Sequence, residues 1–250
     1  MLNLLTKIYS LKSAFSGQIA QKKHNRILMY HSIEREIKDC TNIYTLGLNF
    51  FKEQLDSILD HPGIEVVPFK DSLSALSNNL SITFDDGYKN NLYLAAPIME
   101  QLKIPFTVFI PTDFLKGNQE YLNSSELVEL SKLKFASIGS HGVTHKNLLT
   151  LDKKNIYKEV SDSKKILEDV LGSEVTSFSY PHGGVNSMIR NIVESAGYKM
   201  AATSMFGVNY KNQDRLLLKR TEIWNYDQAS VFEDKLNGFW DWIAMRSYLR

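Results

Sequence analysis

The sequence has few of the features that mark disulfide-bonded or nucleic-acid-binding proteins. Cys40 is its single cysteine, so no disulfide can form within the chain, and no pattern around it predicts a thiol of lowered pKa. A formal net charge of +1, without a basic patch interleaved with aromatic residues, gives no reason to expect nucleic acid as a partner. What remains is 250 residues, 43% hydrophobic and 23% charged, without repeats or low-complexity tracts, which is typical of one globular domain.

Long apolar runs are also missing at both ends of the chain. Residues 2–12 alternate leucines with Asn3, Lys7 and Lys12, so they predict neither a membrane-spanning helix nor a signal peptide, and we expect a cytoplasmic protein. Residues 1–25 could form an amphipathic helix at the inner face of a membrane, with the aromatic residues near 239–243 as a second contact. Two peripheral helices packed on the core, or a subunit contact, would explain the same pattern, so the oligomeric state stays open.

Apolar runs typical of strands alternate with helical patterns along most of the chain. The strand-like runs lie near 27–31, 64–69, 80–85, 105–110, 136–140, 176–180, 199–203 and 216–223. Helices are predicted over 50–59, from Pro97, from a cap at Ser124 or Ser125, and over 153–171 before Gly172. Such alternation predicts a parallel α/β barrel, in which functional residues lie at the C-terminal ends of the strands.

Two adjacent carboxylates, Asp85 and Asp86, end one of these strand-like runs, within Thr-Phe-Asp-Asp-Gly at 83–87. Two histidines, His141 and His145, follow the run at 135–140. If the two strand ends meet, one carboxylate and two neutral imidazoles form a three-ligand metal site with room for water, while the other carboxylate can act as a base. The pattern indicates a metal-dependent hydrolase, although each motif alone is weak, because Asp-Asp-Gly after a strand is most often a turn.

Together with a third segment, Phe-Ser-Tyr-Pro-His-Gly-Gly at 178–184, these blocks resemble the polysaccharide deacetylases of the NodB-homology type, carbohydrate esterase family four. Further matching stretches lie at 27–33 and 104–110, and the resemblance covers about residues 26–224. It implies a distorted, TIM-like (β/α) barrel over 26–224, preceded by an amphipathic extension at 1–25 and followed by an aromatic helical extension at 225–250.

The resemblance also implies a role for each matching residue. Asp85 corresponds to the catalytic base of the family. The metal ligands of the family correspond to Asp86, His141 and His145. The family completes its oxyanion hole with a backbone N–H that maps onto His182, beside Tyr180 and Pro181 as further oxyanion or substrate residues. The implied cofactor is one divalent metal, zinc as first choice, with cobalt or nickel also suited to mixed nitrogen and oxygen ligands.

This sequence departs from the family pattern in three places. Gly142 stands where a serine or threonine usually follows the first histidine, so a hydroxyl that would brace the loop is missing. The third block lacks the arginine that orients the base, and His182 replaces an aromatic residue. The late leucine-x-histidine motif that supplies the general acid would fall at 218–223, but no histidine follows His182.

The general acid must therefore come from another position. His31, at the end of the first strand-like run, is the preferred candidate, and His182 and Glu222 are the others. Each has a simpler interpretation: His31 could be satisfied by neighbouring backbone, and Glu222 could be a solvated strand residue or a partner of Arg220.

These assignments predict an enzyme that removes acetyl groups from N-acetylated amino sugars of a polysaccharide, oligosaccharide or glycolipid. An acetylated carbohydrate is then the expected partner. Two alternatives stay open. An O-acetyl polysaccharide esterase could use the same site, since only the leaving group changes, and the missing general acid would also fit a carbohydrate-binding pseudoenzyme.

Overall fold

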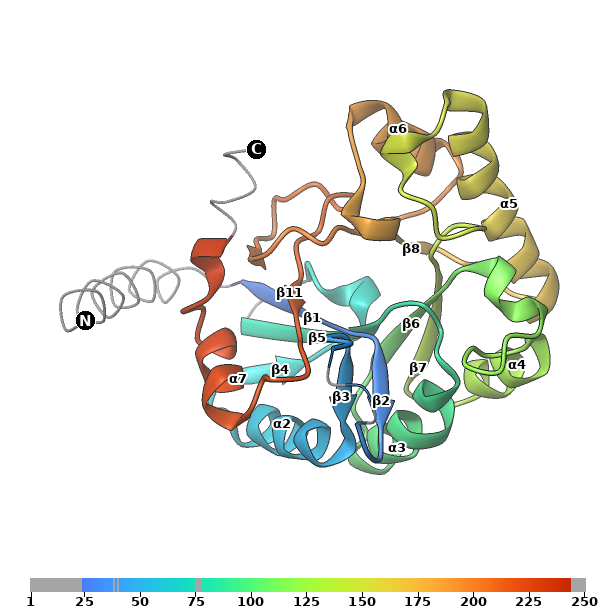
Figure 1. Ribbon diagram of the computed structural model, residues 1–250. Coiled ribbons are helices and arrows are strands. Elements are labelled where there is room, and N and C mark those ends of the chain that lie inside the picture. The colour runs from blue at the N-terminus through green and yellow to red at the C-terminus, as the bar shows by residue number, and fades with distance from the viewer. Residues whose placement is uncertain (1–23, 38, 40, 75–77, 244–250) are drawn as a thin grey trace.

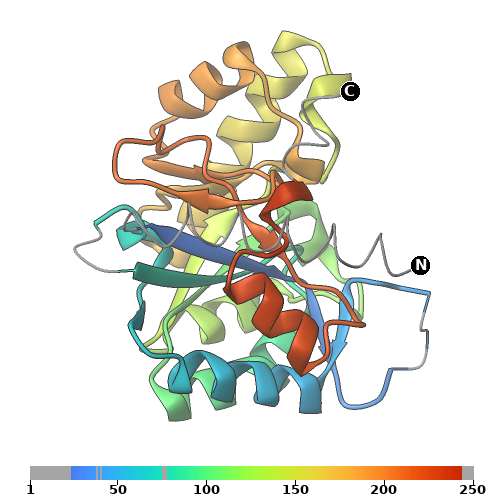
Figure 2. The ribbon, with the colours of Figure 1, turned by 90° about the vertical axis from the view of Figure 1, so that its left-hand side faces the viewer.

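The computed structural model describes residues 24–37, 39, 41–74 and 78–243 (Figure 1). Most of them form a twisted, mainly parallel sheet that curls into an irregular barrel, with helices on its outer side (Figure 2). The predicted distorted (β/α) barrel is therefore confirmed. The amphipathic extension expected at 1–25 lies almost wholly outside the described residues.

The central sheet has the strand order β10-β1-β5-β6-β7-β8-β9, while β4 pairs with β5 and β11 with β1. Its strands are β1 (Asn25–Tyr30), β4 (Ile64–Val66), β5 (Asn78–Phe84), β6 (Phe106–Ile110), β7 (Ala136–Ser140), β8 (Ser177–Ser179), β9 (Met200–Ala202), β10 (Val208–Asn209) and β11 (Thr221–Glu222). A separate parallel pair joins β2 (Ser32–Glu34) to β3 (Thr45–Gly47). Every residue of β1 and β6 is buried, as expected for parallel strands covered on both faces.

Six α-helices lie in the described part of the chain: α2 (Leu48–Asp60), α3 (Ala96–Leu102), α4 (Ser124–Ser131), α5 (Lys153–Leu171), α6 (Ser187–Ser195) and α7 (Ala229–Leu236). A π-helix, η2 (Asn91–Ala95), leads into α3. The short 3-10 helices are η1 (Phe69–Asp71), η3 (Thr112–Lys116), η4 (Leu148–Thr150), η5 (Pro181–Gly183) and η6 (Asp241–Ile243).

Several predicted boundaries need correction. The helix expected from Pro97 starts earlier, because the π-helix runs directly into α3 and makes Pro97 its second residue. The cap of α4 is Asn123 rather than a serine. The strand-like run at 216–223 forms only the two-residue β11 and one isolated bridge. Between these two pairings, Lys219 bonds to the side chain of Asn209 and Arg220 donates to the carbonyl of Met205, which lies outside the strands.

That run nevertheless closes the barrel. Leu218 bridges β9 at Ala202, and Thr221 pairs with Leu28 of β1. We call residues 218–222 the closing segment, because they connect the last strand of the sheet to the first. The pairing of β1 with β5 is six residues long, whereas that of β1 with β11 is two residues long. The barrel is therefore held by fewer strand pairs at the closing segment than at β5.

Aromatic packing fills the interior between β1, β5, β6 and α2. The ring of Phe84 lies 5.5 Å from Tyr30, 6.0 Å from Phe51 and 6.0 Å from Phe106. All four side chains are at most 1% exposed. This core fixes the end of β5, and therefore the residues that follow Phe84.

The described C-terminal residues pack on the barrel. Arg26 of β1 makes a bidentate ion pair with Asp241 at 2.8 and 2.9 Å, and Ser57 of α2 donates a hydrogen bond to Glu233 of α7. Among the described residues, no helix combines the length and apolar content that crossing a bilayer requires.

Candidate active site

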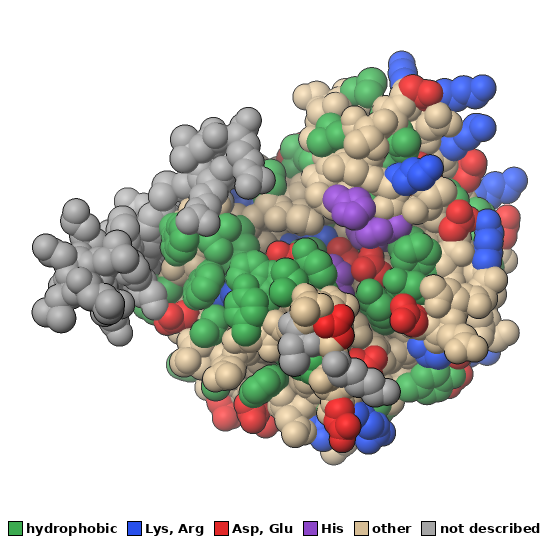
Figure 3. All heavy atoms as spheres, in the orientation of Figure 1, with side chains coloured by type: hydrophobic (Ala, Val, Ile, Leu, Met, Phe, Trp, Pro, Cys, Tyr) green, Lys and Arg blue, Asp and Glu red, His purple; other side chains and the backbone are tan. Residues whose placement is uncertain are grey.

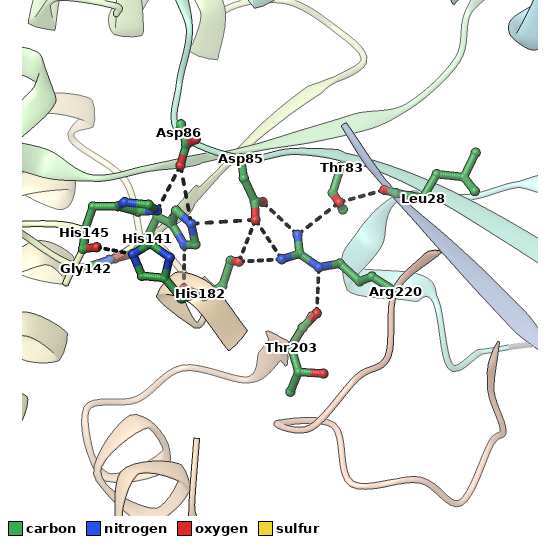
Figure 4. A network of polar contacts seen from close by, with 12 residues as sticks. Leu28, Thr83, Asp85, Asp86, His141, Gly142, His145, His182, Thr203 and Arg220 are labelled. Carbon is green, nitrogen blue, oxygen red and sulfur yellow. Dashed lines mark hydrogen bonds and ion pairs between the residues drawn. The ribbon is translucent and has the colours of Figure 1, made fainter. Parts of the chain in front are cut away.

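The predicted site residues come together at the C-terminal ends of neighbouring strands. Asp85 and Asp86 directly follow β5, and His141 directly follows β7. Because β6 pairs in parallel with both β5 and β7, the C-terminal ends of these strands lie at the same edge of the sheet. His145 reaches the same point from the loop beyond His141 (Figure 4).

The backbone around these side chains adopts left-handed conformations that residues other than glycine seldom occupy. Asp86, His145 and His182 have φ angles of 70°, 59° and 56°. Each costs of order 1–3 kcal/mol, and such strain concentrates at functional sites. Gly87 follows at φ 65°, where a Cβ would lie 2.7 Å from the Cδ1 atom of Ile110, so this turn requires glycine.

Asp86, His141 and His145 offer ligand atoms that all lie within 4.8 Å of one another. Oδ1 of Asp86 is 3.1 Å from Nε2 of His145 and 3.6 Å from Nε2 of His141. This oxygen is buried and makes no well-directed hydrogen bond within the described chain. Three converging lone pairs with no directed proton between them fit a divalent cation, and the donor set of two imidazoles and one carboxylate suits zinc, cobalt or nickel.

The pKa values of the two histidines are shifted in opposite directions. Burial lowers the pKa of His141 to about 4, against the opposing charge of Asp85, so this ring is neutral at pH 7. Its Nδ1 lies 2.7 Å from the carbonyl of Ser179. A proton on that nitrogen leaves the Nε2 lone pair facing Asp86, as in metal-ligating histidines. For His145, the effect of burial is outweighed by nearby negative charge, that of Asp86 above all, which raises its pKa.

Asp85 is held by a buried arginine that sequence analysis did not assign to it. Two nitrogens of Arg220 bind its two carboxylate oxygens, each at 2.7 Å. The prediction that Arg220 could pair with Glu222 is therefore wrong. Burial alone would raise the pKa of Asp85, but the charge of Arg220, helped by His141, holds it well below its usual range.

Arg220 is itself fixed on every side. It is fully buried, and its remaining contacts are with the carbonyl of Thr203 at 2.9 Å, the hydroxyl of Ser179 at 2.9 Å and the hydroxyl of Thr83 at 3.3 Å. It belongs to the closing segment, so the arginine missing from the third block is replaced by one from another part of the chain. Its position within the expected late motif, at 218–223, was the one available signal.

His31 lies beside the two carboxylates. Its charge lowers the pKa of both Asp85 and Asp86, and its ring is 4.7 Å from that of Tyr44. Asn91 donates to its carbonyl at 2.8 Å and so fixes the backbone. The ring Nδ1 is buried without a hydrogen-bond partner in the described part of the chain, which argues against a ring satisfied by neighbouring backbone.

The third block, at 178–184, lies against the candidate ligand His145. The His182 ring is 4.6 Å from that of His145, and its Nε2 is 3.1 Å from the His145 carbonyl. Tyr180 is fully buried and donates its hydroxyl to the carbonyl of Leu216 at 2.9 Å. Its side chain is therefore turned away from the side on which Ser179 meets Asp85, and the oxyanion or substrate role of Tyr180 stays a prediction. Pro181 is buried beside Gly142.

Glu222 lies at the end of the closing segment and is partly exposed. Its charge contributes to raising the pKa of both Tyr44 and Tyr226, after burial. These tyrosines are 41% and 50% exposed, and an Asn225 backbone bond to the carbonyl of Ile43 joins their loops at 2.8 Å. Figure 3 shows a hydrophobic patch beside the histidines and carboxylates of the site.

A polar groove adjoins the site. Its volume is about 430 Å³, and its lining includes Ser32, Glu34, Tyr88, Asn90 and Tyr93. Two of its lining residues, Ser32 and Tyr88, follow His31 and Asp86 in the chain by one and two positions. The site is thus bordered by aromatic rings and by hydrogen-bonding groups, the two kinds of surface that sugars contact.

Comparison with known proteins agrees with this geometry. The family model for polysaccharide deacetylase matches residues 75–201. YxkH of Bacillus subtilis, assigned by name to the polysaccharide deacetylases, is 27% identical over 203 residues, 79% of this chain and 70% of the relative. The poly-beta-1,6-N-acetyl-D-glucosamine N-deacetylase of Staphylococcus aureus is 25% identical over 195 residues, 70% of this chain but 65% of the relative, less than two thirds of its length.

Solved structures show the same fold. The Streptococcus pyogenes deacetylase PplD, in complex with acetate, superposes with a TM-score of 0.76 at 23% identity, covering 86% of this chain and 99% of that one. The matched segment 75–201 contains Asp85, Asp86, His141, His145 and the third block. This chain belongs to the polysaccharide deacetylase family.

Proposed function

We propose that this protein is a metal-dependent hydrolase that removes acetyl groups from N-acetylated amino sugars of a polysaccharide, oligosaccharide or glycolipid. One observation carries the proposal: Asp86, His141 and His145 converge on a point beside a second carboxylate, Asp85, which Arg220 holds ionised. Membership of the polysaccharide deacetylase family supports a carbohydrate deacetylase. The metal, the specificity for N-acetyl groups and the residue roles given below are our proposal.

A divalent cation held by these three ligands would polarise the acetyl carbonyl and acidify a water molecule, the two kinds of help that amide hydrolysis needs. Zinc is the first choice, and cobalt or nickel would suit the same ligands. Neutral His141 is ready to bind a cation at pH 7, because burial has already removed its proton.

Asp85 acts as the general base. It stays ionised through the neutral range because Arg220 offsets the cost of its burial, and the bidentate contact fixes the plane of its carboxylate. Its Oδ2 lies 3.6 Å from Nε2 of His141, so a water beside the ligand nitrogens would be within its reach. Asp85 accepts the proton of that water during attack.

His31 supplies the proton that the departing amine requires. Its ring is close enough to lower the pKa of both carboxylates, and its Nδ1 has no partner among the described residues to hold it elsewhere. Glu222 is the reserve candidate. The backbone N–H of His182, in the left-handed turn ahead of Gly183, is the proposed donor to the oxyanion.

The substrate class follows from the surroundings of the ligands. Tyr44 and Tyr226 present exposed rings beside the site, and the polar groove adjoins it on the side of Ser32 and Tyr88. The staphylococcal relative is named as an N-deacetylase of a polymeric N-acetylglucosamine. The tyrosines and the groove favour a glycan, and the name of the relative favours one that is N-acetylated.

Acetate release from a panel of substrates tests the reaction. The panel contains N-acetylhexosamine polymers, oligomers, lipid-linked sugars and an O-acetylated polysaccharide, each with wild type and Asp85→Asn. We expect wild type to release acetate from at least one N-acetylated member. Release from the O-acetylated member alone would replace the proposal by an esterase, and sugar binding without any release would indicate a pseudoenzyme.

Elemental analysis tests the metal separately. We expect about one divalent ion per chain in wild type, lost in His141→Ala and His145→Ala and retained in His61→Ala, a histidine at the far end of α2. Equal metal in all four proteins would reject the site.

The leaving group tests His31. His31→Ala should slow turnover of an N-acetyl substrate more than that of an activated acetyl ester, which departs without a proton. An equal loss on both substrates, together with a lower melting temperature, would make His31 structural and move the acid to Glu222 or His182.

A further inference from the structure

A buried carboxylate on helix α5 lies beneath the loop that carries the two ligand histidines. Oε2 of Glu159 accepts hydrogen bonds from the backbone N–H groups of Val143 and Thr144, at 2.8 and 2.9 Å. Its Oε1 accepts one from the Thr144 hydroxyl at 2.6 Å. The three donors all belong to the residues between His141 and His145.

The other face of the same loop is also bound. The carbonyl of Gly142 accepts from the N–H of Thr112 at 3.1 Å, and the carbonyl of Val143 accepts from the N–H of Asp113 at 2.9 Å. The loop therefore has its carbonyl groups fixed by the start of η3 and its N–H groups fixed by Glu159. Hydrogen bonds to a charged acceptor are roughly twice as strong as neutral ones, so the carboxylate is the stronger of the two attachments.

Glycine at position 142 is what admits this carboxylate. Gly142 has a φ of 77°, and a Cβ built on it would lie 3.0 Å from Oε2 of Glu159. A side chain here would be strained by its backbone and would crowd the acceptor. A carboxylate from helix α5 thus braces the loop in place of the hydroxyl expected at this position.

We propose that Glu159 is a positioning residue for the metal site, which fixes the loop so that His145 stands at the correct distance from His141 before a cation binds. The inference rests on the proposed function for the metal site itself. His145 occupies a left-handed conformation at φ 59°, and an unbraced loop would relax it to a more common one. Relaxation would move its Nε2 away from Asp86.

A purely structural role for Glu159 would predict something different. Its side chain is only 7% exposed, so removing it would lower stability whatever its effect on metal. A positioning role predicts weaker metal affinity beyond what lost stability explains. Metal affinity and melting temperature of the metal-free protein must therefore be measured on the same variants.

The chain supplies a matched control on the same helix. Glu168 also accepts a hydrogen bond from a loop N–H, that of Val175, at 2.9 Å, but at the opposite end of α5 and in a loop without ligands. Glu168→Gln and Glu159→Gln both exchange one acceptor oxygen for an amide nitrogen, which can only donate. The two variants differ in whether the disturbed loop carries histidines.

Titration of metal-free protein with Co²⁺, followed by its visible absorption, gives both affinity and ligand geometry. We expect Glu159→Gln to weaken Co²⁺ binding about 10–100-fold, the usual effect of losing a group that orients a ligand, and to alter the absorption bands. Glu168→Gln should lower the melting temperature and leave the Co²⁺ titration unchanged. Thr144→Val, which removes only the hydroxyl donor, should weaken binding by a smaller factor.

Wild-type affinity in Glu159→Gln, or an equal loss in Glu168→Gln, would overturn the proposal. If Glu159→Gln fails to fold, Thr144→Val decides, and an unchanged Co²⁺ titration there overturns it. A wild-type protein that binds no Co²⁺ would reject the metal site and this inference together. Binding by wild type with no difference among the variants would reject Glu159 alone.

Discussion

At the scale of single residues, two neighbouring carboxylates have different surroundings and therefore different proposed roles. Asp85 is paired with a buried guanidinium at 2.7 Å, whereas Asp86 faces two imidazole rings and has a buried oxygen without a well-directed hydrogen bond in the described chain. One is held as a charged acceptor for a proton, and the other is available to a cation. The two adjacent side chains point in different directions. The backbone turns left-handed at Asp86, and its carboxylate faces His141 and His145 rather than Arg220.

The two roles predict different losses. Asp85→Asn should keep the metal but slow deacetylation by ~10²–10⁴, the usual contribution of a positioned general base. Asp86→Asn should weaken metal binding itself, since an amide is a poorer ligand than a carboxylate. Elemental analysis and acetate release on both variants distinguish them. If both lost metal equally and recovered fully with excess ion, Asp85 would not be the base.

Arg220 sets the pH range in which Asp85 is ionised. In wild type the lowered pKa of Asp85 means that its stabilising effect is present above ~3.9, the ordinary value, and is lost as pH falls toward the folded value. In Arg220→Met, uncompensated burial raises the pKa of Asp85. We therefore expect the acid limb of kcat/KM to move to higher pH, and stability at neutral pH to fall by ~3–5 kcal/mol.

The pH profile and urea unfolding check this prediction, with Arg190→Met as the control. Arg190 pairs with Asp214 at the surface, 21% and 37% exposed, so its loss should cost at most ~1 kcal/mol and leave the profile in place. An unshifted acid limb in Arg220→Met would show that Asp85 is not the titrating base.

Whether the sequence predicts a site residue depends on how far along the chain that residue lies from its partners. Asp85, Asp86, His141 and His145 were identifiable because short motifs at strand ends carry them, and parallel pairing brings the ends together. Arg220 and Glu159 were missed. Arg220 is 135 positions from Asp85, and its place within the expected late motif at 218–223 does not say which residue it pairs with.

At the scale of elements, local signals predicted helices better than strands. Helix α5 has the bounds expected from its pattern, because Asp152 caps its start and Gly172, at φ 66°, ends it. Helix α6 was not predicted, α7 was expected only as part of a helical extension over 225–250, and β11 is far shorter than expected. The caps of a helix are set by residues next to it in the sequence. The length of a short strand is set by its pairing with a strand that lies far away in the sequence.

Helix α4 gives a test of such a local signal. Asn123 accepts from the N–H groups of Ser125 and Glu126, and Glu126 accepts in return from the Asn123 N–H. Asn123→Ala should cost ~0.5–2 kcal/mol in unfolding free energy, and Asn123→Asp should retain most of it. Urea unfolding measures both. Equal stability of the alanine variant and wild type would show that the cap contributes nothing.

At the scale of the whole molecule, the C-terminal residues are joined to the barrel by a buried ion pair. Lys235 of α7 contacts Asp227 at 2.5 Å, the Glu222 carbonyl at 2.7 Å and the face of Trp224 at 3.6 Å. Burial lowers the pKa of Lys235 to about 8, although Asp227 opposes the shift. Lys235 therefore links α7 to Asp227 through a buried ion pair and to the closing segment through the Glu222 carbonyl.

Breaking one half of the pair should cost more than removing both. Lys235→Met leaves Asp227 buried without a cation and should lower the unfolding free energy by ~3–5 kcal/mol, while adding Asp227→Asn should restore part of it. Urea unfolding of the two variants and the double variant measures this coupling. Additive losses would show that the two groups do not stabilise one another.

The closing segment has a consequence for the time course of folding. Its pairing with β1 joins residues such as Leu28 and Thr221, nearly the whole chain apart, and contacts of such long sequence separation form slowly. The same segment delivers Arg220 to Asp85. A refolding chain should therefore regain its helical circular dichroism before its hydrolytic activity, and that delay would report the moment at which the barrel closes.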